Sequence, residues 1–370
     1  MSFYKELGID CYINAHDTYT IYGASRMSPR TLSAMKEAAE HFVDINQMQR
    51  VLGEKIATMT NNEGAYISNG AAAALTLATA VCMVGNDPYL FSKLPNTVGL
   101  KDEIIVIRGQ RNGYDKAIEV AGATLVEIGN ADETLAYELA GAIHHRTAAV
   151  FYFQSMNYER ASLPLSDVID IAHGKGIPVV VDAAAQLPPV ENLWKFTQMG
   201  ADLALFSGGK TLAGPQDSGL ILGRAGLITA CHQFGAPTHG VCRGSKTSRE
   251  AMAGLYVALE EYLAMDQEKE YARLEKICLQ LEKTMANGGL DTTIVPFGPV
   301  GQTYPRVFGQ CQSPSQALEI AAKMKAQKIY IGCEKWTNQI YISPLNLRPE
   351  EVEIVEKTLG EILREAVNRS

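Results

Sequence analysis

Short apolar segments alternate with helix-length segments through the middle of the chain, and this alternation limits the possible folds more than any other feature. Helix-length segments such as 71–84 and 166–175 separate several of the apolar ones. Continuous apolar strands linked by helices predict an α/β fold with a mostly parallel sheet covered on both faces. Ligands of such sheets bind beyond the carboxyl ends of the strands. The β-rich segments cover residues 65–67, 104–107, 124–128, 148–153, 178–181, 203–206 and 219–222.

The C-terminal third predicts a second, smaller α+β domain. Its expected elements are a long helix over 249–285, strands over 293–296, 304–308 and 340–343, and helices over 315–326 and 349–366. We therefore expect three parts. These are an N-terminal segment over 1–60 that packs on the small domain or on a partner subunit, a large ligand-binding domain over 61–248, and a linking helix with the small domain over 249–370.

Composition excludes several classes of protein. A net charge of −8 disfavours a non-specific nucleic-acid binder, which would carry a basic excess. No apolar run approaches the roughly 20 residues of a membrane span, and the N-terminus has no apolar secretory segment, so we expect a cytoplasmic protein. The seven cysteines form no C-x-x-C pair and the seven histidines form no H-E-x-x-H motif, so no metal site is expected.

One lysine lies in a glycine-rich turn between two of the apolar segments. The stretch 206–223 reads FSGGKTLAGPQDSGLILG and contains Lys210, and the apolar run before it, PVVVD, ends in Asp182. A lysine amine forms a Schiff base with pyridoxal phosphate, and a buried carboxylate keeps the pyridine nitrogen protonated so that the ring can accept electrons. The pair predicts a pyridoxal-phosphate enzyme in which Lys210 and Asp182 are catalytic.

Two other interpretations of Lys210 have less support. The nucleotide-binding loop G-x-x-x-x-G-K-[ST] requires a glycine where this chain has Ala204, and it opens a long helix. Here Gly214 and Pro215 interrupt any such helix, which argues against nucleotide binding. The second alternative is a structural surface lysine in a glycine turn, and the presence of Asp182 argues against it.

Small residues after other strands predict the rest of a cofactor site. Gly70, Ala71 and Ala72 follow the strand at 65–67 and begin a helix, whose free amides suit a phosphate group. Ser207 adds a hydroxyl near the lysine, although a turn-capping serine would look the same. Three further candidates complete the expected site: Ala184 as a flat contact for the ring, Asn157 as a partner of its phenolic oxygen, and a residue of 108–112 on its other face.

At this point the chain resembles a known family. The motifs SNGAA at 68–72, NY at 157–158, VDAA at 181–184 and FSGGK-x-L-x-GPQ at 206–216 are similar to those of the aspartate-aminotransferase-type, fold type I superfamily. The lysine turn resembles the SGDK-x-LGGPQ turn of its selenocysteine-synthase-like branch, with Gly209 in place of the aspartate. The stretch INAHDTYTIYGASRMSP at 13–29 resembles the opening of the D-glucosaminate-6-phosphate ammonia-lyase group.

This resemblance implies an α,β-elimination on a 2-amino-3-hydroxy acid, which yields a 2-keto acid and ammonia. It implies an amino acid or amino-sugar acid as substrate and an active site in a homodimer or higher homo-oligomer. Arg26, Lys246 and Arg306 are the candidate cations for anionic substrate groups. His16, Tyr19 and Tyr22 are candidate proton donors. The alternatives are another pyridoxal-phosphate reaction (transamination, racemisation or carbon–sulfur cleavage), a tRNA-dependent selenium transferase, and an inactive protein that retains the fold.

Overall fold

The chain divides into two compact units. The computed structural model describes residues 3–334 and 336–367. One unit covers residues 27–264, and the other combines residues up to Arg26 with those from Met265 onward. The three-part division at residues 60 and 248 that the sequence suggests stays a prediction.

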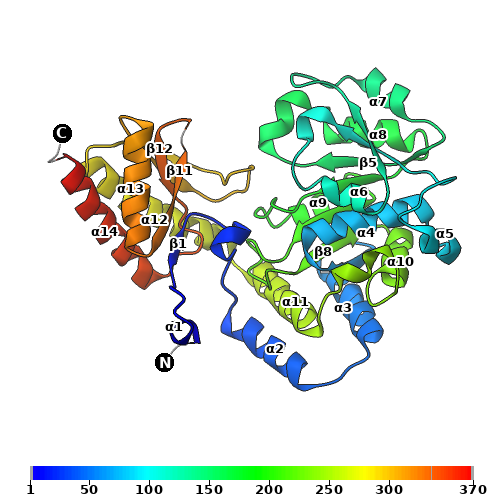
Figure 1. The fold of residues 1–370 in the computed structure, drawn as a ribbon, viewed down its shortest axis with the longest axis horizontal. Coiled ribbons are helices and arrows are strands. Elements are labelled where there is room, and N and C mark those ends of the chain that lie inside the picture. The colour runs from blue at the N-terminus through cyan, green and yellow to red at the C-terminus, as the bar shows by residue number, and fades with distance from the viewer. Residues whose placement is uncertain (1–2, 335, 368–370) are drawn as a thin grey trace. The chain divides into compact units, whose positions relative to one another are not determined.

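A seven-stranded sheet forms the centre of the large unit, as the sequence predicts (Figure 1). Its order is β2-β8-β7-β6-β5-β3-β4, and only β8 runs antiparallel to its neighbours. The carboxyl ends of the other six strands therefore lie at one edge of the sheet. The strands are β2 (Gly64–Ser68), β3 (Glu103–Ile107), β4 (Thr124–Ile128), β5 (Thr147–Phe153), β6 (Val179–Asp182), β7 (Leu203–Ser207) and β8 (Gly219–Gly223).

Helices cover both faces of this sheet because the strand side chains alternate between two apolar cores. In β5, for example, Val150 and Tyr152 enter one core while Phe151 and Phe153 enter the other. The first core lies under α3 (Ile45–Met59), α7 (Ala136–Ala142), α8 (Leu165–His173), α9 (Asn192–Gln198) and α11 (Arg249–Ala264). The second lies under α4 (Gly70–Val84), α5 (Pro88–Lys93), α6 (Lys116–Val120) and α10 (Ala225–Phe234). Helix α2 (Pro29–Glu40) packs on α11.

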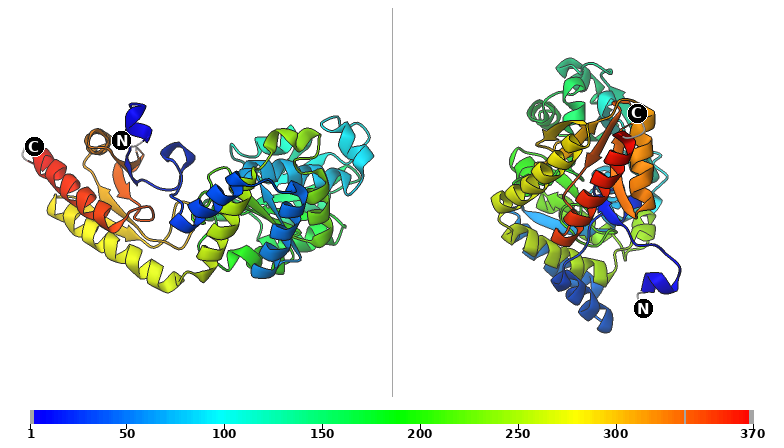
Figure 2. Two further views of the ribbon diagram at one scale, coloured as in Figure 1. Left: turned by 90° about the horizontal axis from the view of Figure 1, so that it is seen from below. Right: turned by 90° about the vertical axis from the view of Figure 1, so that its left-hand side faces the viewer.

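The small unit contains a five-stranded sheet with helices packed on one face (Figure 2). The strand order is β1-β11-β12-β10-β9, in which β1 pairs with β11 in parallel and the remaining pairs are antiparallel. The strands are β1 (Ile13–Ala15), β9 (Asp291–Val295), β10 (Arg306–Gln310), β11 (Ile329–Glu334) and β12 (Gln339–Ile342), and the helices are α12 (Gln267–Asn287), α13 (Pro314–Ala326) and α14 (Pro349–Val367). Val307 and Ile340 point into the core beneath these helices.

The prediction of one long helix over 249–285 is wrong, because two helices, α11 and α12, occupy that stretch. Asp266 separates them: its side chain accepts a hydrogen bond from the Lys269 amide, which caps the new helix. Strands β1 and β11 are additions that the sequence does not predict. Among the described residues, no helix is both long and apolar enough to cross a membrane.

Candidate active site

Hydrogen bonds connect the carboxyl ends of the adjacent strands β6 and β7. The Ala184 amide donates to Asp182 Oδ1 at 2.9 Å, and the Ala184 carbonyl accepts from the Ser207 amide at 3.3 Å. Parallel pairing of Asp182 with Leu205 fixes this register. Three of the residues predicted from sequence, Asp182, Ala184 and Ser207, therefore lie side by side. The Ser207 hydroxyl has no hydrogen-bond partner among the described residues.

A tight loop between β7 and β8 holds Lys210. The loop closes on itself, since the Gly208 amide donates to the Ser218 carbonyl at 2.8 Å. A Cβ at Gly209 would lie 2.5 Å from Gln216 Cα, so only glycine fits there. The glycine that replaces the aspartate of related turns thus has a steric reason in this chain. A strand rather than a helix follows the loop, in agreement with the exclusion of a nucleotide-binding loop.

Lys210 is close enough to Asp182 for their charges to interact. Burial raises the pKa of Asp182, while the Ala184 amide and the positive charge of Lys210 counteract that rise only in part. The strand-end carboxylate and the loop lysine predicted from sequence therefore share one local environment.

The start of α4 completes this edge of the sheet. Asn69 is the N-cap of α4 and makes no side-chain capping bond, so its side chain satisfies none of the first amides of the helix. Gly70 has a φ of 75°, and a Cβ at Gly219 would lie 2.7 Å from the Gly70 carbonyl carbon. Gly219 pairs with both Ser68 and Ser207, which brings the helix start and the β7 end together. Ala71 and Ala72, partly exposed or exposed, follow directly.

These residues fit pyridoxal phosphate. The amides at the start of α4 suit its phosphate, and the partly buried Asp182 suits a protonated pyridine nitrogen. A Cβ added at Gly70 would meet no atom within 4 Å, so open space lies beside the start of α4.

Asn157 and its neighbour Tyr158 lie on the short 3₁₀ helix Met156–Ala161 that follows β5. The Asn157 amide donates to Ser155 Oγ at 3.2 Å, so this turn is ordered by its own hydroxyl cap. Tyr158 is a residue for which sequence reasoning proposed no role. Burial and the charge of Asp182 raise its pKa, and a hydrogen bond with Asn112 opposes that rise. The signal that could have found Tyr158 is its position just after a buried strand end.

The three predicted substrate-binding cations have different surroundings. Lys246 is exposed, and its carbonyl accepts a 2.9 Å hydrogen bond from the Asn69 side chain, which places its backbone beside the start of α4. In the small unit Arg26 already has a carboxylate partner, since its two terminal nitrogens contact the two oxygens of Glu351 at 2.7 and 2.5 Å. That ion pair ties Arg26 to α14.

Arg306 begins β10 in the small unit and is only 7% exposed. Its guanidinium lies 5.0 Å from the ring centroid of Phe308 and 5.3 Å from that of Tyr341. Its Nε donates to the Phe297 carbonyl at 3.2 Å. Across the described residues, no carboxylate forms an ion pair with it. A buried arginine in this state is a candidate for binding an anionic ligand group.

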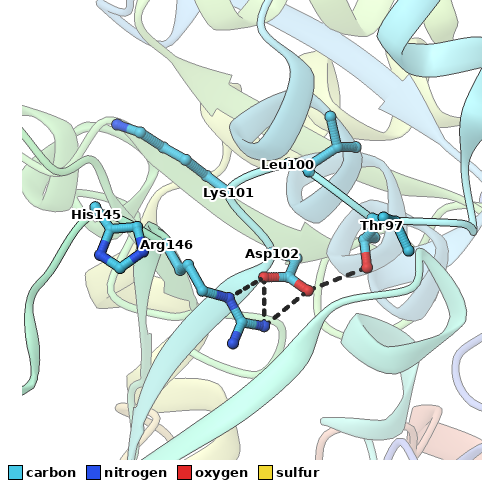
Figure 3. Close-up of a pocket in the computed structure, with 8 residues that line it drawn as sticks. Thr97, Leu100, Lys101, Asp102, His145 and Arg146 are labelled. Atoms are coloured by element: carbon cyan, nitrogen blue, oxygen red, sulfur yellow. Dashed lines mark hydrogen bonds and ion pairs between the residues drawn. The ribbon is translucent and has the colours of Figure 1, made fainter.

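A surface cavity of about 490 Å³ lies elsewhere on the large unit (Figure 3). Residues 97–102 line it with His145 and Arg146, and Figure 3 shows Arg146 pointing at Asp102. The guanidinium contacts both oxygens of that carboxylate, at 2.9 and 3.1 Å. None of the predicted site residues lines this cavity.

Comparison with known proteins places the chain in a family. The family model described as L-seryl-tRNA selenium transferase, SelA, matches residues 30–286. A 5'-C-glycyluridine monooxygenase-decarboxylase from Streptomyces sp is 31% identical, over 97% of this chain and 92% of that protein. The D-glucosaminate-6-phosphate ammonia lyase of Salmonella typhimurium is 32% identical, over 70% of each chain.

Solved structures agree with this placement. A structure of D-glucosaminate-6-phosphate ammonia-lyase superposes with a TM-score of 0.85 at 26% identity, over 99% of both chains. A serine palmitoyltransferase from S. paucimobilis, solved with bound PLP, matches in fold alone, with a TM-score of 0.61 at 14% identity over 96% of this chain and 88% of that one. The chain therefore belongs to the SelA family and has the aspartate-aminotransferase-like fold of pyridoxal-phosphate enzymes of fold type I.

Proposed function

We propose that this protein is a pyridoxal-phosphate-dependent lyase that acts on an anionic 2-amino-3-hydroxy acid and releases a 2-keto acid and ammonia. The observation that carries the proposal is the placement of Lys210 and Asp182 in one environment at the carboxyl ends of β6 and β7. The similarity to a D-glucosaminate-6-phosphate ammonia lyase supports the choice of reaction.

Each residue at this edge of the large sheet has a separate task. The amides at the start of α4 and the Ser207 hydroxyl bind the phosphate group, and Asp182 accepts a hydrogen bond from the protonated pyridine nitrogen. Pyridoxal phosphate, when bound, draws electrons from the substrate's Cα and so weakens its Cα–H bond. The Lys210 amine then takes that proton as the general base. Burial of Asp182 strengthens its hydrogen bond by excluding water.

The substrate's anionic group requires a cation, and Arg306 is our choice among the three predicted ones. It is buried against two neighbouring aromatic rings and has no ion-pair partner among the described residues. Arg26 is a weaker choice because an anion would have to displace Glu351 from it. Lys246 keeps its predicted role as a second contact, because its backbone lies beside the start of α4.

The first test is the absorption spectrum of the purified protein. We expect a visible band that borohydride abolishes and that Lys210→Ala lacks, with Lys195→Ala, another lysine of the large unit, as the matched control. Incubation with amino-sugar acids should then yield ammonia and a keto acid without a co-substrate. A protein that gains no band when pyridoxal phosphate is added would overturn the proposal.

A second candidate is the chemistry named for the Streptomyces relative, which matches a larger share of this chain than the lyase does. Anaerobic incubation separates the two. An elimination proceeds without oxygen, whereas a monooxygenase reaction stops. Release of CO2 that depends on oxygen, in place of ammonia, would favour the second candidate. We also propose, by analogy with the family, that the protein is a cytoplasmic homodimer, which sedimentation and cell fractionation would test.

A further inference from the structure

The N-terminal segment of the small unit places a histidine next to the buried Arg306. The His16 ring lies against that of Tyr22, with ring centroids 4.2 Å apart and the planes tilted by 35°, and the Tyr341 hydroxyl lies 3.4 and 3.5 Å from the two ring nitrogens of His16. Tyr341 is also one of the two rings that lie beside the Arg306 guanidinium. One aromatic ring therefore contacts both basic side chains. We call His16, Arg306, Phe308 and Tyr341 the basic–aromatic cluster.

The pairing of the small sheet explains how the cluster forms. Phe308 pairs with Tyr341, and Arg306 lies two residues before Phe308, so all three side chains share one face. That face is opposite to the one that Val307 and Ile340 present to the helices. A Cβ at Gly332, which pairs with Tyr341, would lie 2.1 Å from its ring, so glycine is needed for Tyr341 to lie flat there.

Hydrogen bonds within the N-terminal segment fix the backbone position of His16. Asn14 Oδ1 accepts from the amides of His16 and Asp17 at 3.0 and 3.3 Å. The Asp17 carboxylate accepts hydrogen bonds from the Thr18 amide, at 2.7 Å, and from the Tyr304 hydroxyl. Among the described residues no ion pair joins Asp17 and Arg306, although the positive charge of Arg306 acts on Asp17 and partly opposes the rise of its pKa.

Electrostatics keep His16 neutral in this setting. Burial first, and then the positive charge of Arg306, lower the pKa of His16 to about 4. An oxyanion bound to Arg306 would cancel that repulsion and attract a proton to the imidazole. The ionisable groups around His16 are Arg306 on β10, Tyr341 on β12, Tyr330 and Glu334 on β11, Tyr304 before β10, and Asp17, Tyr19 and Tyr22 on its own segment.

We propose that His16 is the second cation of an oxyanion-binding site centred on Arg306, neutral without a ligand and protonated as the anion binds. The proton comes from solvent, and only the imidazole N–H bond forms. The ligand is the carboxylate or phosphate of a small molecule, held by a guanidinium and an imidazolium together. This inference rests on the proposed function, because it takes the bound anion to be a group of the substrate.

The test is a pH titration of the histidine ring signals in the full-length protein, ¹³C-labelled at histidine, as purified and after addition of pyridoxal phosphate. His16→Gln removes the His16 signal and so assigns it. Tyr341→Phe shifts the same signal and assigns it independently if His16→Gln does not fold. The titration is repeated with saturating acetate and with saturating sulfate. Sulfate keeps a constant charge over the pH range in which His16 titrates. We expect either anion to raise the pKa of His16 by at least about one unit. A response to acetate alone identifies a carboxylate ligand, and one to sulfate alone identifies a phosphate ester.

Arg306→Met is the decisive variant. Without added anion it should raise the pKa of His16, because the repelling charge is gone, and it should abolish the response to acetate and sulfate. An unchanged pKa of His16 with both anions, or a response that survives in Arg306→Met, would overturn the inference. The titration needs no turnover, so it can fail while the lysine spectrum succeeds, and the reverse also holds.

Discussion

The hydroxyl of Tyr304 lies 2.9 and 3.0 Å from the two carboxylate oxygens of Asp17, two residues that are 287 positions apart in the chain. Both side chains are almost fully buried, and burial raises the pKa of Asp17. Gly298 makes room for the tyrosine, because a Cβ there would lie 2.7 Å from its hydroxyl oxygen. This contact attaches the N-terminal segment, and therefore His16, to the small unit.

Removal of this hydroxyl should destabilise the small unit. We expect Tyr304→Phe to lower the free energy of unfolding by about 1 to 3 kcal/mol, since a buried carboxylate loses a donor. Tyr137→Phe, at a tyrosine that is 71% exposed, is the matched control and should change little. Urea denaturation measures both. Equal effects of the two substitutions would show that the Asp17 contact contributes no stability.

The stability of the protein should depend on pH through His16. Its pKa in the folded protein, about 4, lies below the ordinary value of 6.5. The contribution of His16 is therefore complete above pH 6.5 and is lost as the pH falls from 6.5 to 4, because only the unfolded chain takes up the proton there. With allowance for solvent screening of a partly exposed ring, the loss is about 1 to 2 kcal/mol.

The difference between wild type and His16→Gln isolates this effect from all other titrating groups. When the unfolding free energies of both proteins are measured at several pH values by urea denaturation, wild type should lose stability relative to His16→Gln as the pH falls. A constant difference across this range would contradict the lowered pKa.

Gly219→Ala should weaken cofactor binding as well as the fold. The new Cβ would lie 2.7 Å from the Gly70 carbonyl carbon and 2.9 Å from the Phe206 carbonyl oxygen, so the start of α4 must shift. We expect about 1 to 3 kcal/mol of destabilisation and at least a tenfold weaker affinity for pyridoxal phosphate, an estimate equal to roughly 1.4 kcal/mol. Equilibrium dialysis measures the affinity.

Gly141→Ala is the control for that substitution. Gly141 lies on α7 and is exposed, and a Cβ added there would meet no atom within 4 Å, so alanine should be neutral or slightly stabilising. If Gly219→Ala bound pyridoxal phosphate as tightly as Gly141→Ala does, the start of α4 would not be the phosphate site.

Asp202→Ala should be the most destabilising of these changes. Its buried carboxylate accepts from the Val179 amide at 2.7 Å and pairs with His173 at 2.8 Å and with Arg224 at 2.7 Å. Removal leaves a buried amide without its partner and breaks a link between strands β6, β7 and β8, which we expect to cost about 3 kcal/mol. Asp132→Ala, at a 72% exposed carboxylate paired with exposed Arg160, should cost about 0.5 kcal/mol or less. Thermal and urea denaturation would compare the two.

Local patterns in the sequence were enough to predict most of the strands of the large unit. All seven strands lie within one residue of the predicted segments, because most of them are buried and read as continuous apolar runs, which are visible without distant information. The side-by-side placement of Asp182 and Ser207 followed from the rule that parallel strands end at one edge. The strands of the small unit were harder to predict from the sequence. Strands β1 and β11 are short and only partly apolar, and their parallel pairing joins residues more than 300 positions apart.

The sequence by itself determined the α/β fold, the lysine loop and the strand-end aspartate, since each depends on residues close together in the chain. Only the tertiary structure decided which predicted cations have partners. Arg26 pairs with Glu351, while Arg306 lies buried against Phe308 and Tyr341 without an ion-pair partner in the part of the chain that is described. The charge and solvation of a side chain depend on groups that folding brings from distant positions, and no local pattern records them.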